Sequence, residues 1–173
     1  AIEFSLVNAM SREFTLKNSI REIKDNYDYV LIDCMPSLGM ITINALACSD
    51  KIIIPVQGEY LAAKGMGHLL KTVNRVHKQI NPNLKIGGVL LTLVDKRTNL
   101  SKDVRDTINE NYGHYVNIYN TEIPKAINTA KSTSTGKSIF EFDKNSPVAE
   151  AYKNLAKEVL DNERTRTKNE TSK

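Results

Sequence analysis

The feature that most constrains the fold is an apolar run over residues 30–32 that ends in Asp33 and continues into a Pro-Ser-Leu-Gly segment at 36–39. A continuous apolar run without polar alternation is typical of a strand buried on both faces of a parallel sheet. We therefore predict a strand over residues 28–33. Open α/β sheets bind ligands at the carboxyl ends of their strands, which is where Asp33 would lie.

Two roles are open for Asp33 on the residues alone. A carboxylate at the end of a strand can hold Mg²⁺ through its water shell, because Mg²⁺ prefers oxygen ligands and gives up water reluctantly. This is the Walker B role in P-loop NTPases. The alternative is an acidic residue that only caps the helix that follows it.

Strand-like and helix-like segments alternate along the chain. The pattern predicts further strands over residues 52–56, 86–94 and, more weakly, 116–123. It predicts helices within 5–25, over 37–48, 59–80 and 98–112, within 125–138 and from 146 onward. This alternation indicates an α/β protein with a mainly parallel, twisted sheet flanked by helices.

Composition is that of an ordinary globular chain, with 173 residues, 40% apolar and 25% charged residues, and a net charge of +4. We expect one domain over residues 1–160 and a polar, disordered tail over 161–173. The sequence has no apolar run of membrane-spanning length and no signal peptide. Cys34 and Cys48 have no metal-ligand spacing, so we interpret them as reduced core thiols of a cytoplasmic protein.

The triplet Gly136-Lys137-Ser138 looks like the end of a phosphate-binding loop but does not fit one. The Walker A pattern G-x-x-x-x-G-K-[ST] requires glycine at position 131, where this chain has lysine. The triplet also precedes an apolar run instead of following a strand and opening a helix. We therefore reject it as a Walker A motif.

Several strings, in order from about residue 3 to residue 160, closely resemble the ParA/Soj partition ATPases. They lie at residues 28–39, 42–46, 55–60, 88–92, 97–99, 123–124 and 136–137. The resemblance implies a P-loop NTPase-like, three-layer α/β/α fold. The family's P-loop lies upstream of where this chain begins, so we expect a fragment that lacks the P-loop strand. In the family, that strand lies between those matching 28–33 and 51–55.

The resemblance also implies an ATP and Mg²⁺ site. Asp33 corresponds to the catalytic Walker B residue near Mg²⁺, and the segment 34–39, with Pro36 and Ser37, to the switch that senses the γ-phosphate. Ser37 can also cap a helix. Thr92, Asp95 and Pro124 match parts of the family that lie beside the adenine. The alternative interpretation is that these residues only form strand ends and a turn.

Partition ATPases of this type bind DNA non-specifically as ATP-bound dimers, which requires cations to meet phosphates. The candidates here are Lys96, Arg97, Lys102, Arg105, Lys125, Lys131, Lys137 and Lys144. Each one alone could be an ordinary surface charge. The chain also departs from the family, because Asn128 stands where an arginine is common and Lys131 where a glutamate is common.

The leading hypothesis is a ParA-like ATPase of plasmid or chromosome partitioning. The resemblance implies a nucleoid-associated homodimer whose ATP hydrolysis is stimulated by a centromere-binding, ParB-like partner. One alternative is a non-catalytic DNA-binding or adaptor module without a P-loop. A MinD-like membrane-cycling ATPase is disfavoured, because the tail over 162–169 has no bulky apolar residues to bind a membrane.

Overall fold

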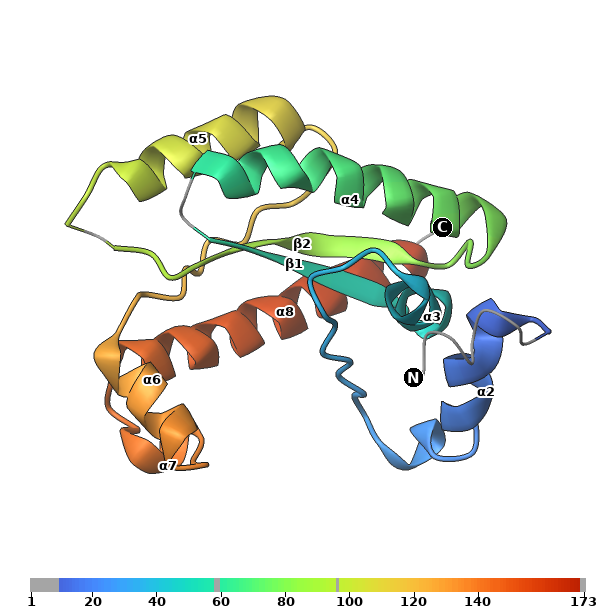
Figure 1. Ribbon diagram of the computed structural model, residues 1–173, viewed down its shortest axis with the longest axis horizontal. Coiled ribbons are helices and arrows are strands. Elements are labelled where there is room, and N and C mark those ends of the chain that lie inside the picture. Colours follow the sequence, from blue (N-terminus) through green and yellow to red (C-terminus); the bar gives the residue numbers. More distant parts are fainter. Residues whose placement is uncertain (1–9, 58–59, 96, 172–173) are drawn as a thin grey trace. The chain divides into compact units, whose positions relative to one another are not determined.

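The structure, a computed structural model, describes residues 10–57, 60–95 and 97–171 (Figure 1). Its elements are η1 (Arg12–Phe14), α2 (Thr15–Ile20), η2 (Lys24–Asn26), α3 (Met40–Cys48), β1 (Lys51–Gln57), α4 (Tyr60–Gln79), β2 (Lys85–Thr92), α5 (Leu100–Tyr112), α6 (Ile127–Ser134), α7 (Ile139–Phe142) and α8 (Pro147–Thr171). The chain forms two compact units. One covers Ala1–Ile52 and Gly65–Ile86, and the other covers Ile53–Lys64 and Gly87–Lys173.

Strands β1 and β2 pair with each other, and helix α4 connects them along the chain. On β2, Val89 also forms a parallel bridge with Ile118, and Val94, just beyond the strand, forms one with Pro124. The predictions of strands over 52–56 and 86–94 are confirmed. The weaker strand predicted over 116–123 is reduced to these isolated bridges. The predicted α/β class, with a parallel sheet flanked by helices, is confirmed.

The first unit has a core in which α3 and α4 pack together. Leu46 of α3 and the α4 residues Val73 and Val76 are buried with Leu84. The buried Asn81 side chain donates hydrogen bonds to the carbonyl oxygens of Leu46 (3.0 Å) and Ser49 (2.8 Å). These bonds satisfy carbonyl groups near the end of α3, where a helix leaves its last carbonyls without intrahelical partners.

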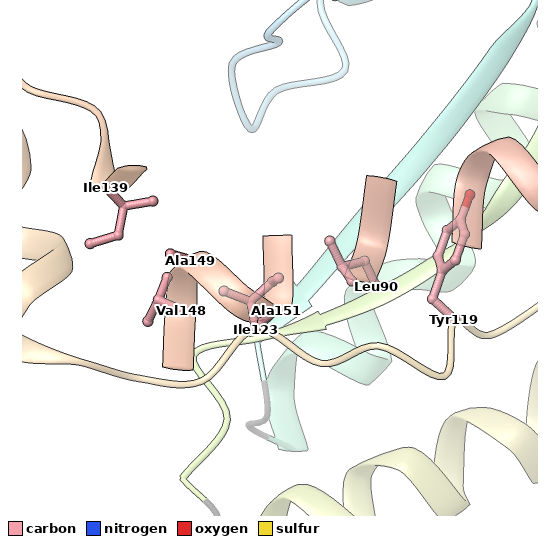
Figure 2. Close-up of a cluster of buried hydrophobic side chains, with 7 residues drawn as sticks. All are labelled: Leu90, Tyr119, Ile123, Ile139, Val148, Ala149 and Ala151. Carbon is pink, nitrogen blue, oxygen red and sulfur yellow. The ribbon is translucent and has the colours of Figure 1, made fainter. Parts of the chain in front are cut away.

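The second unit has its own core, in which α8 packs against β2 and the segment beside it (Figure 2). The buried members of this cluster are Leu90, Tyr119, Ile123, Ile139, Val148, Ala149 and Ala151. Small residues on α8 let the helix approach closely, while Tyr119 is one of the largest fully buried side chains. The amphipathic pattern predicted from residue 146 onward therefore describes a real packing face.

The strand predicted over 28–33 is not formed. Residues 29–35 have no assigned secondary structure, and the sheet of the described residues contains β1 and β2. Of the apolar side chains expected to be buried, Leu31 is 92% and Val30 46% accessible, and Ile32 is half-buried. A strand needs a neighbouring strand to bond its N–H and C=O groups, and no described segment forms a ladder with this one.

Two smaller expectations also differ from the structure. Helix α8 continues to Thr171, so the segment expected to be a disordered tail from residue 161 is helical as far as it is described. Cys34 is exposed instead of lying in a core, and Cys48 is half-buried. Among the described residues, no helix is both long enough and apolar enough to cross a membrane.

Gly136 ends helix α6 and confirms that the Gly-Lys-Ser triplet follows a helix and not a strand. Its φ of +67° lies in the left-handed region. The N–H of Gly136 donates to the carbonyl of Thr133, and the N–H of Lys137 donates to the carbonyl of Ser132. This is the Schellman arrangement, in which a left-handed glycine closes the last turn of a helix.

Replacing Gly136 by alanine should destabilise the protein by roughly 1–2 kcal/mol, because a side chain disfavours the left-handed conformation. A Cβ atom at Gly136 meets nothing within 4 Å, so the cost is one of backbone conformation and not of a clash. Gly65→Ala is the matched control, since Gly65 lies within α4 with the same open space. The control should stabilise by roughly 0.5–1 kcal/mol. Urea unfolding measures both, and equal effects of the two substitutions would contradict the assignment.

Candidate functional site

In the first unit, Asp33, Pro36 and Ser37 lie in the exposed segment that leads into α3. Helix α3 begins at Met40 with Gly39 at its N-cap, so the prediction that Ser37 caps the helix is wrong. The Ser37 N–H instead donates to the carbonyl of Met35 at 2.8 Å, and the Ser37 carbonyl accepts a hydrogen bond from the Thr42 hydroxyl. The segment is thus a tight turn tied to the first turn of α3.

In the second unit, the structure brings Thr92, Asp95 and Pro124 together at the carboxyl end of β2. The Val94 N–H donates to the carbonyl of Ile123, and the Lys125 N–H donates to the carbonyl of Val94, both at 3.0 Å. These two bonds place Pro124 opposite Val94. The three residues therefore lie at the sheet edge where open α/β folds bind ligands. We call Thr92–Asp95 with Ile123–Lys125 the β2-end loops.

Leu93, in the middle of these loops, was not singled out from the sequence. Its φ is +53°, and its side chain is 47% exposed. A left-handed conformation is uncommon for a residue with a bulky side chain, and such strain often marks functional sites. The sequence does not predict this left-handed conformation, because leucine is not a typical turn residue.

Asp95 and Arg97 form a close pair beside Leu93. The Arg97 guanidinium donates to both carboxylate oxygens of Asp95, at 2.9 and 2.7 Å, and the Arg97 N–H donates to one of them at 3.0 Å. These bonds to Arg97 hold the pKa of Asp95 well below its usual range. The carboxylate is therefore ionised and fixes the turn that precedes α5. Arg97 remains exposed over most of its side chain.

The segment beside β2 contains a bulge. The Tyr119 N–H donates to the carbonyl of Val89, and the next bond to β2 runs from the Ile123 N–H to the carbonyl of Leu91. The segment advances four residues while β2 advances two, so two residues are extra relative to a regular parallel ladder. The backbone groups around Asn120 and Thr121 consequently cannot bond β2. We call Asn120–Thr121 the bulge.

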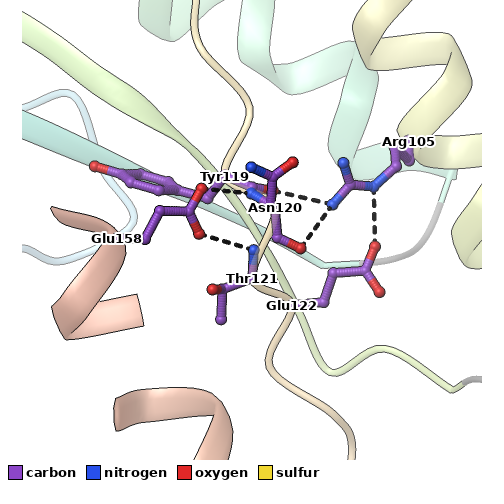
Figure 3. A network of polar contacts seen from close by, with 6 residues as sticks. All are labelled: Arg105, Tyr119, Asn120, Thr121, Glu122 and Glu158. Atoms are coloured by element: carbon purple, nitrogen blue, oxygen red, sulfur yellow. Dashed lines mark hydrogen bonds and ion pairs between the residues drawn. The ribbon is translucent and has the colours of Figure 1, made fainter. Parts of the chain in front are cut away.

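Two charged side chains from different helices bond these displaced backbone groups (Figure 3). Glu158 of α8 accepts from the N–H groups of Asn120 (2.7 Å) and Thr121 (2.9 Å). Arg105 of α5 donates to the carbonyls of Tyr119 (3.0 Å) and Asn120 (3.4 Å). Arg105 also donates to the Glu122 carboxylate at 3.0 Å. Sequence reasoning missed Glu158, because nothing in a helix-surface glutamate marks a partner 37 residues away.

Among the described cation candidates, Arg97 and Arg105 bond carboxylates within the protein, whereas the lysines are exposed. Arg105 is half-buried and uses its guanidinium within the protein, so it is the least suited of them to meet a phosphate. Lys102, Lys125, Lys131, Lys137 and Lys144 are exposed. The last four lie in residues 125–144, which hold α6 and α7. A hydrogen bond from Asn128 to Asp143 (2.8 Å) joins α6 to the turn after α7. Lys96 lies outside the described residues.

The donor set suits a hydrated magnesium ion better than a protein-caged metal. The described residues contain no group of three or more His, Cys, Asp or Glu side chains that could hold a metal ion. Mg²⁺ keeps several waters and is typically bound by one or two carboxylates together with substrate phosphates. The exposed carboxylate of Asp33 fits that use.

Known proteins with similar sequences indicate the family of this chain. A family described as AAA domain matches residues 1–86. Protein Soj of Bacillus subtilis, described as a sporulation initiation inhibitor, is 47% identical over 160 residues, which are 92% of this chain and 62% of Soj. The chromosome-partitioning ATPase Soj of Treponema pallidum is 40% identical over 155 residues, 90% of this chain and 60% of that protein. The chain belongs to the ParA/Soj family.

Solved structures place the ParA/Soj chain in the P-loop ATPase fold. Cobyrinic acid a,c-diamide synthase from Mycobacterium smegmatis superimposes with a TM-score of 0.77 and 33% identity, over 91% of this chain and 57% of that one. Its form with bound ATP analog and magnesium superimposes with a TM-score of 0.67 and 32% identity, over 78% of this chain and 59% of that one. The chain spans about three fifths of the length of the curated relatives above.

Glu158→Gln should destabilise the protein by about 1–3 kcal/mol near neutral pH, because hydrogen bonds to a charged group are lost. Burial acts most strongly on the pKa of Glu158 and raises it, but the N–H groups of residues 120 and 121, the Thr121 hydroxyl and Arg105 together lower it. A lowered pKa in the folded state means that the stabilisation is complete above about pH 4.3, the pKa of a free glutamate, and is lost as pH falls through the folded pKa.

Urea unfolding of both proteins between pH 3 and 7 measures this difference. The difference in the free energy of unfolding between wild type and Glu158→Gln should shrink as the solution becomes acidic. Glu150→Gln is the control, since Glu150 is exposed on the same helix. A gap that does not depend on pH would contradict the role of the ionised carboxylate.

Proposed function

We propose that these residues form most of the nucleotide-switch region of a partition ATPase that binds ATP with Mg²⁺. The observation that carries this proposal is the convergence of Thr92, Asp95 and Pro124 at the carboxyl end of β2, in a chain with close Soj relatives. We propose separately that Asp33 and the turn at Met35–Ser37, in the first unit, act on Mg²⁺ and the γ-phosphate.

In the proposed mechanism, Asp33 would hold Mg²⁺ through its water shell, and the segment 34–39 would respond to the γ-phosphate. When bound, the metal would supply positive charge that offsets the charge of the nucleotide phosphates during phosphoryl transfer. The segment suits a switch, because it is exposed and held to α3 by few hydrogen bonds, among them the bond from Thr42 to the Ser37 carbonyl. The β2-end loops contact the base and ribose.

Titration of a fluorescent ATP analogue with Mg²⁺ into the complete gene product tests this proposal. We expect binding, and Asp33→Asn should reduce ATP hydrolysis by at least about 100-fold, as expected for loss of a residue that acts on the transition state. Asp50→Asn is the matched control, since Asp50 is also an exposed acidic residue of the first unit. Absence of ATP binding, or equal hydrolysis by the Asp33 and Asp50 variants, would overturn the proposal.

We further propose that the ATP-bound protein forms a dimer that binds DNA non-specifically, chiefly through Lys125, Lys131, Lys137 and Lys144. These four lysines are exposed within 20 consecutive residues, and the bond from Asn128 to Asp143 holds part of that segment in a defined shape. Lysine suits contacts that do not depend on sequence, because an ammonium group meets a phosphate as a point charge. A ParB-like, centromere-binding partner would then stimulate hydrolysis and release the DNA.

Replacing these four lysines by glutamine should weaken DNA binding and flatten its dependence on salt. For each phosphate that the variant no longer neutralises, the slope of log K against log salt should fall by about 0.9 for duplex DNA. The control replaces the exposed residues Lys71, Lys78, Lys153 and Lys157, which removes the same charge elsewhere. Fluorescence anisotropy with a labelled duplex measures both slopes with and without ATP. Equal slopes for the two variants would contradict the assignment, and DNA binding that ignores ATP would favour a non-catalytic DNA-binding module.

A further inference from the structure

We propose that Arg105 and Glu158 are positioning residues for nucleotide binding, which act by holding the bulge so that the β2-end loops keep their place. This inference rests on the proposed function, because it assigns the β2-end loops to the nucleotide. Neither side chain needs to touch the ligand. Both act through the backbone of residues 119–121, which they bond from opposite sides (Figure 3).

The first step is that Glu158 and Arg105 fix the backbone conformation of the bulge, which is exposed at Asn120 and half-buried at Thr121. Bonds from Tyr119 to Val89 and from Ile123 to Leu91 leave the backbone between them without a partner on β2. Glu158 is bonded by both displaced N–H groups, and Arg105 is bonded to the two adjoining carbonyls. Because a carboxylate only accepts and a guanidinium only donates, each side chain matches one kind of backbone group.

The second step is that the bulge sets the position of Pro124. Ile123 and Lys125 bond the backbone of Leu91 and Val94 only a few residues after the bulge. Tyr119 and Ile123, which flank the bulge, are both buried in the core of the second unit (Figure 2). The two extra residues therefore let both side chains stay buried while Pro124 reaches Val94. Without the bulge, the segment could not keep both its core contacts and this loop geometry.

The third step is that the two side chains are rigidly supported. Arg105 lies on α5, whose neighbouring residues Val104 and Ile108 are buried, and its guanidinium is oriented by Glu122 at 3.0 Å. Glu158 lies on α8 between Leu155 and Val159, which pack against the core. Binding sites depend on such supporting contacts, because small displacements of the residues that touch a ligand reduce affinity.

The test uses the complete gene product and compares two probes, a fluorescent ATP analogue with Mg²⁺ and tripolyphosphate as its competitor. Glu158→Gln and Arg105→Lys should each weaken binding of the ATP analogue about tenfold, the lower end of what loss of a supporting residue costs a site. Tripolyphosphate has no base or ribose, so its affinity should change by less than about twofold. Glu158→Asp should recover part of the affinity, because the shorter carboxylate can still accept one bond.

Matched controls are Glu150→Gln on α8 and Arg75→Gln on α4, both exposed residues, which should bind both probes as wild type does. Melting temperatures without nucleotide accompany every variant. Equal weakening of the ATP analogue and tripolyphosphate, in step with melting temperature, would mean a purely structural role and would overturn the inference. Unchanged affinity for the ATP analogue in both variants would also overturn it.

The failure of the proposed function gives a different result. If the wild-type protein binds no ATP, the function proposed above is wrong, whatever the variants do. The coupling between the bulge and the β2-end loops is then tested separately, by the backbone amide signal of Lys125 in NMR spectra. A shift of that signal in Glu158→Gln, but not in Glu150→Gln, would support coupling between the bulge and the loop. An unmoved signal would overturn it.

Discussion

Backbone hydrogen bonding of strand β2 is the constraint on which the second unit depends. On one side β2 pairs with β1, and on the other it is bonded by the segment around Tyr119 and Ile123. Near the bulge, backbone groups bond charged side chains instead of a strand: the Tyr119 carbonyl bonds Arg105, and the Asn120 N–H bonds Glu158. Asn120 is exposed and Thr121 is half-buried, so Glu158 and Arg105 take the place of water or of a strand as fixed partners of this irregular segment beside the core.

The same constraint explains residues 28–33. Their apolar sequence is as strand-like as that of β2, yet they form no strand and Leu31 is largely exposed. Apolar content favours burial but does not provide partners for N–H and C=O groups. The difference between the two segments therefore lies in their neighbours and not in their own residues. Strand propensity is accordingly a statement about packing context.

The features of the fold that could be predicted are those with a local sequence pattern. The strands β1 and β2, the long helix α4, and helix α5 were all predicted, because apolar periodicity and flanking turn residues are visible in the sequence. The gathering of Thr92, Asp95 and Pro124 was also accessible, since parallel strands end at a common edge. The bulge and Glu158 were not, because their partners lie far apart in sequence. Ser37 failed as a cap because the helix starts three residues later than its pattern suggests.

The charged residues divide according to their chemistry. Arg97 donates to both carboxylate oxygens of Asp95, as the planar fork of the guanidinium favours. Arg105 makes one bond to Glu122 and uses another nitrogen for the carbonyls of Tyr119 and Asn120. Both pairs organise backbone near the end of β2. The lysines at 125–144 are exposed, and a flexible ammonium group on a solvated surface organises little within the fold. Arg97 and Arg105 thus bond groups within the protein, whereas the lysines at 125–144 are the positive charges available to a partner.

The carboxyl end of β2 concentrates the irregular features of this unit. Leu93 has a left-handed backbone, Asp95 is locked by Arg97, and the bulge lies just before the loop that returns to Val94. A strained residue persists only where the surroundings determine its conformation, and Val94 is bonded on both of its backbone groups immediately after Leu93. Leu93 and Arg97 are exposed, so burial in the core does not explain their conformations. Their occurrence together at one sheet edge supports the proposal that the β2-end loops contact a ligand.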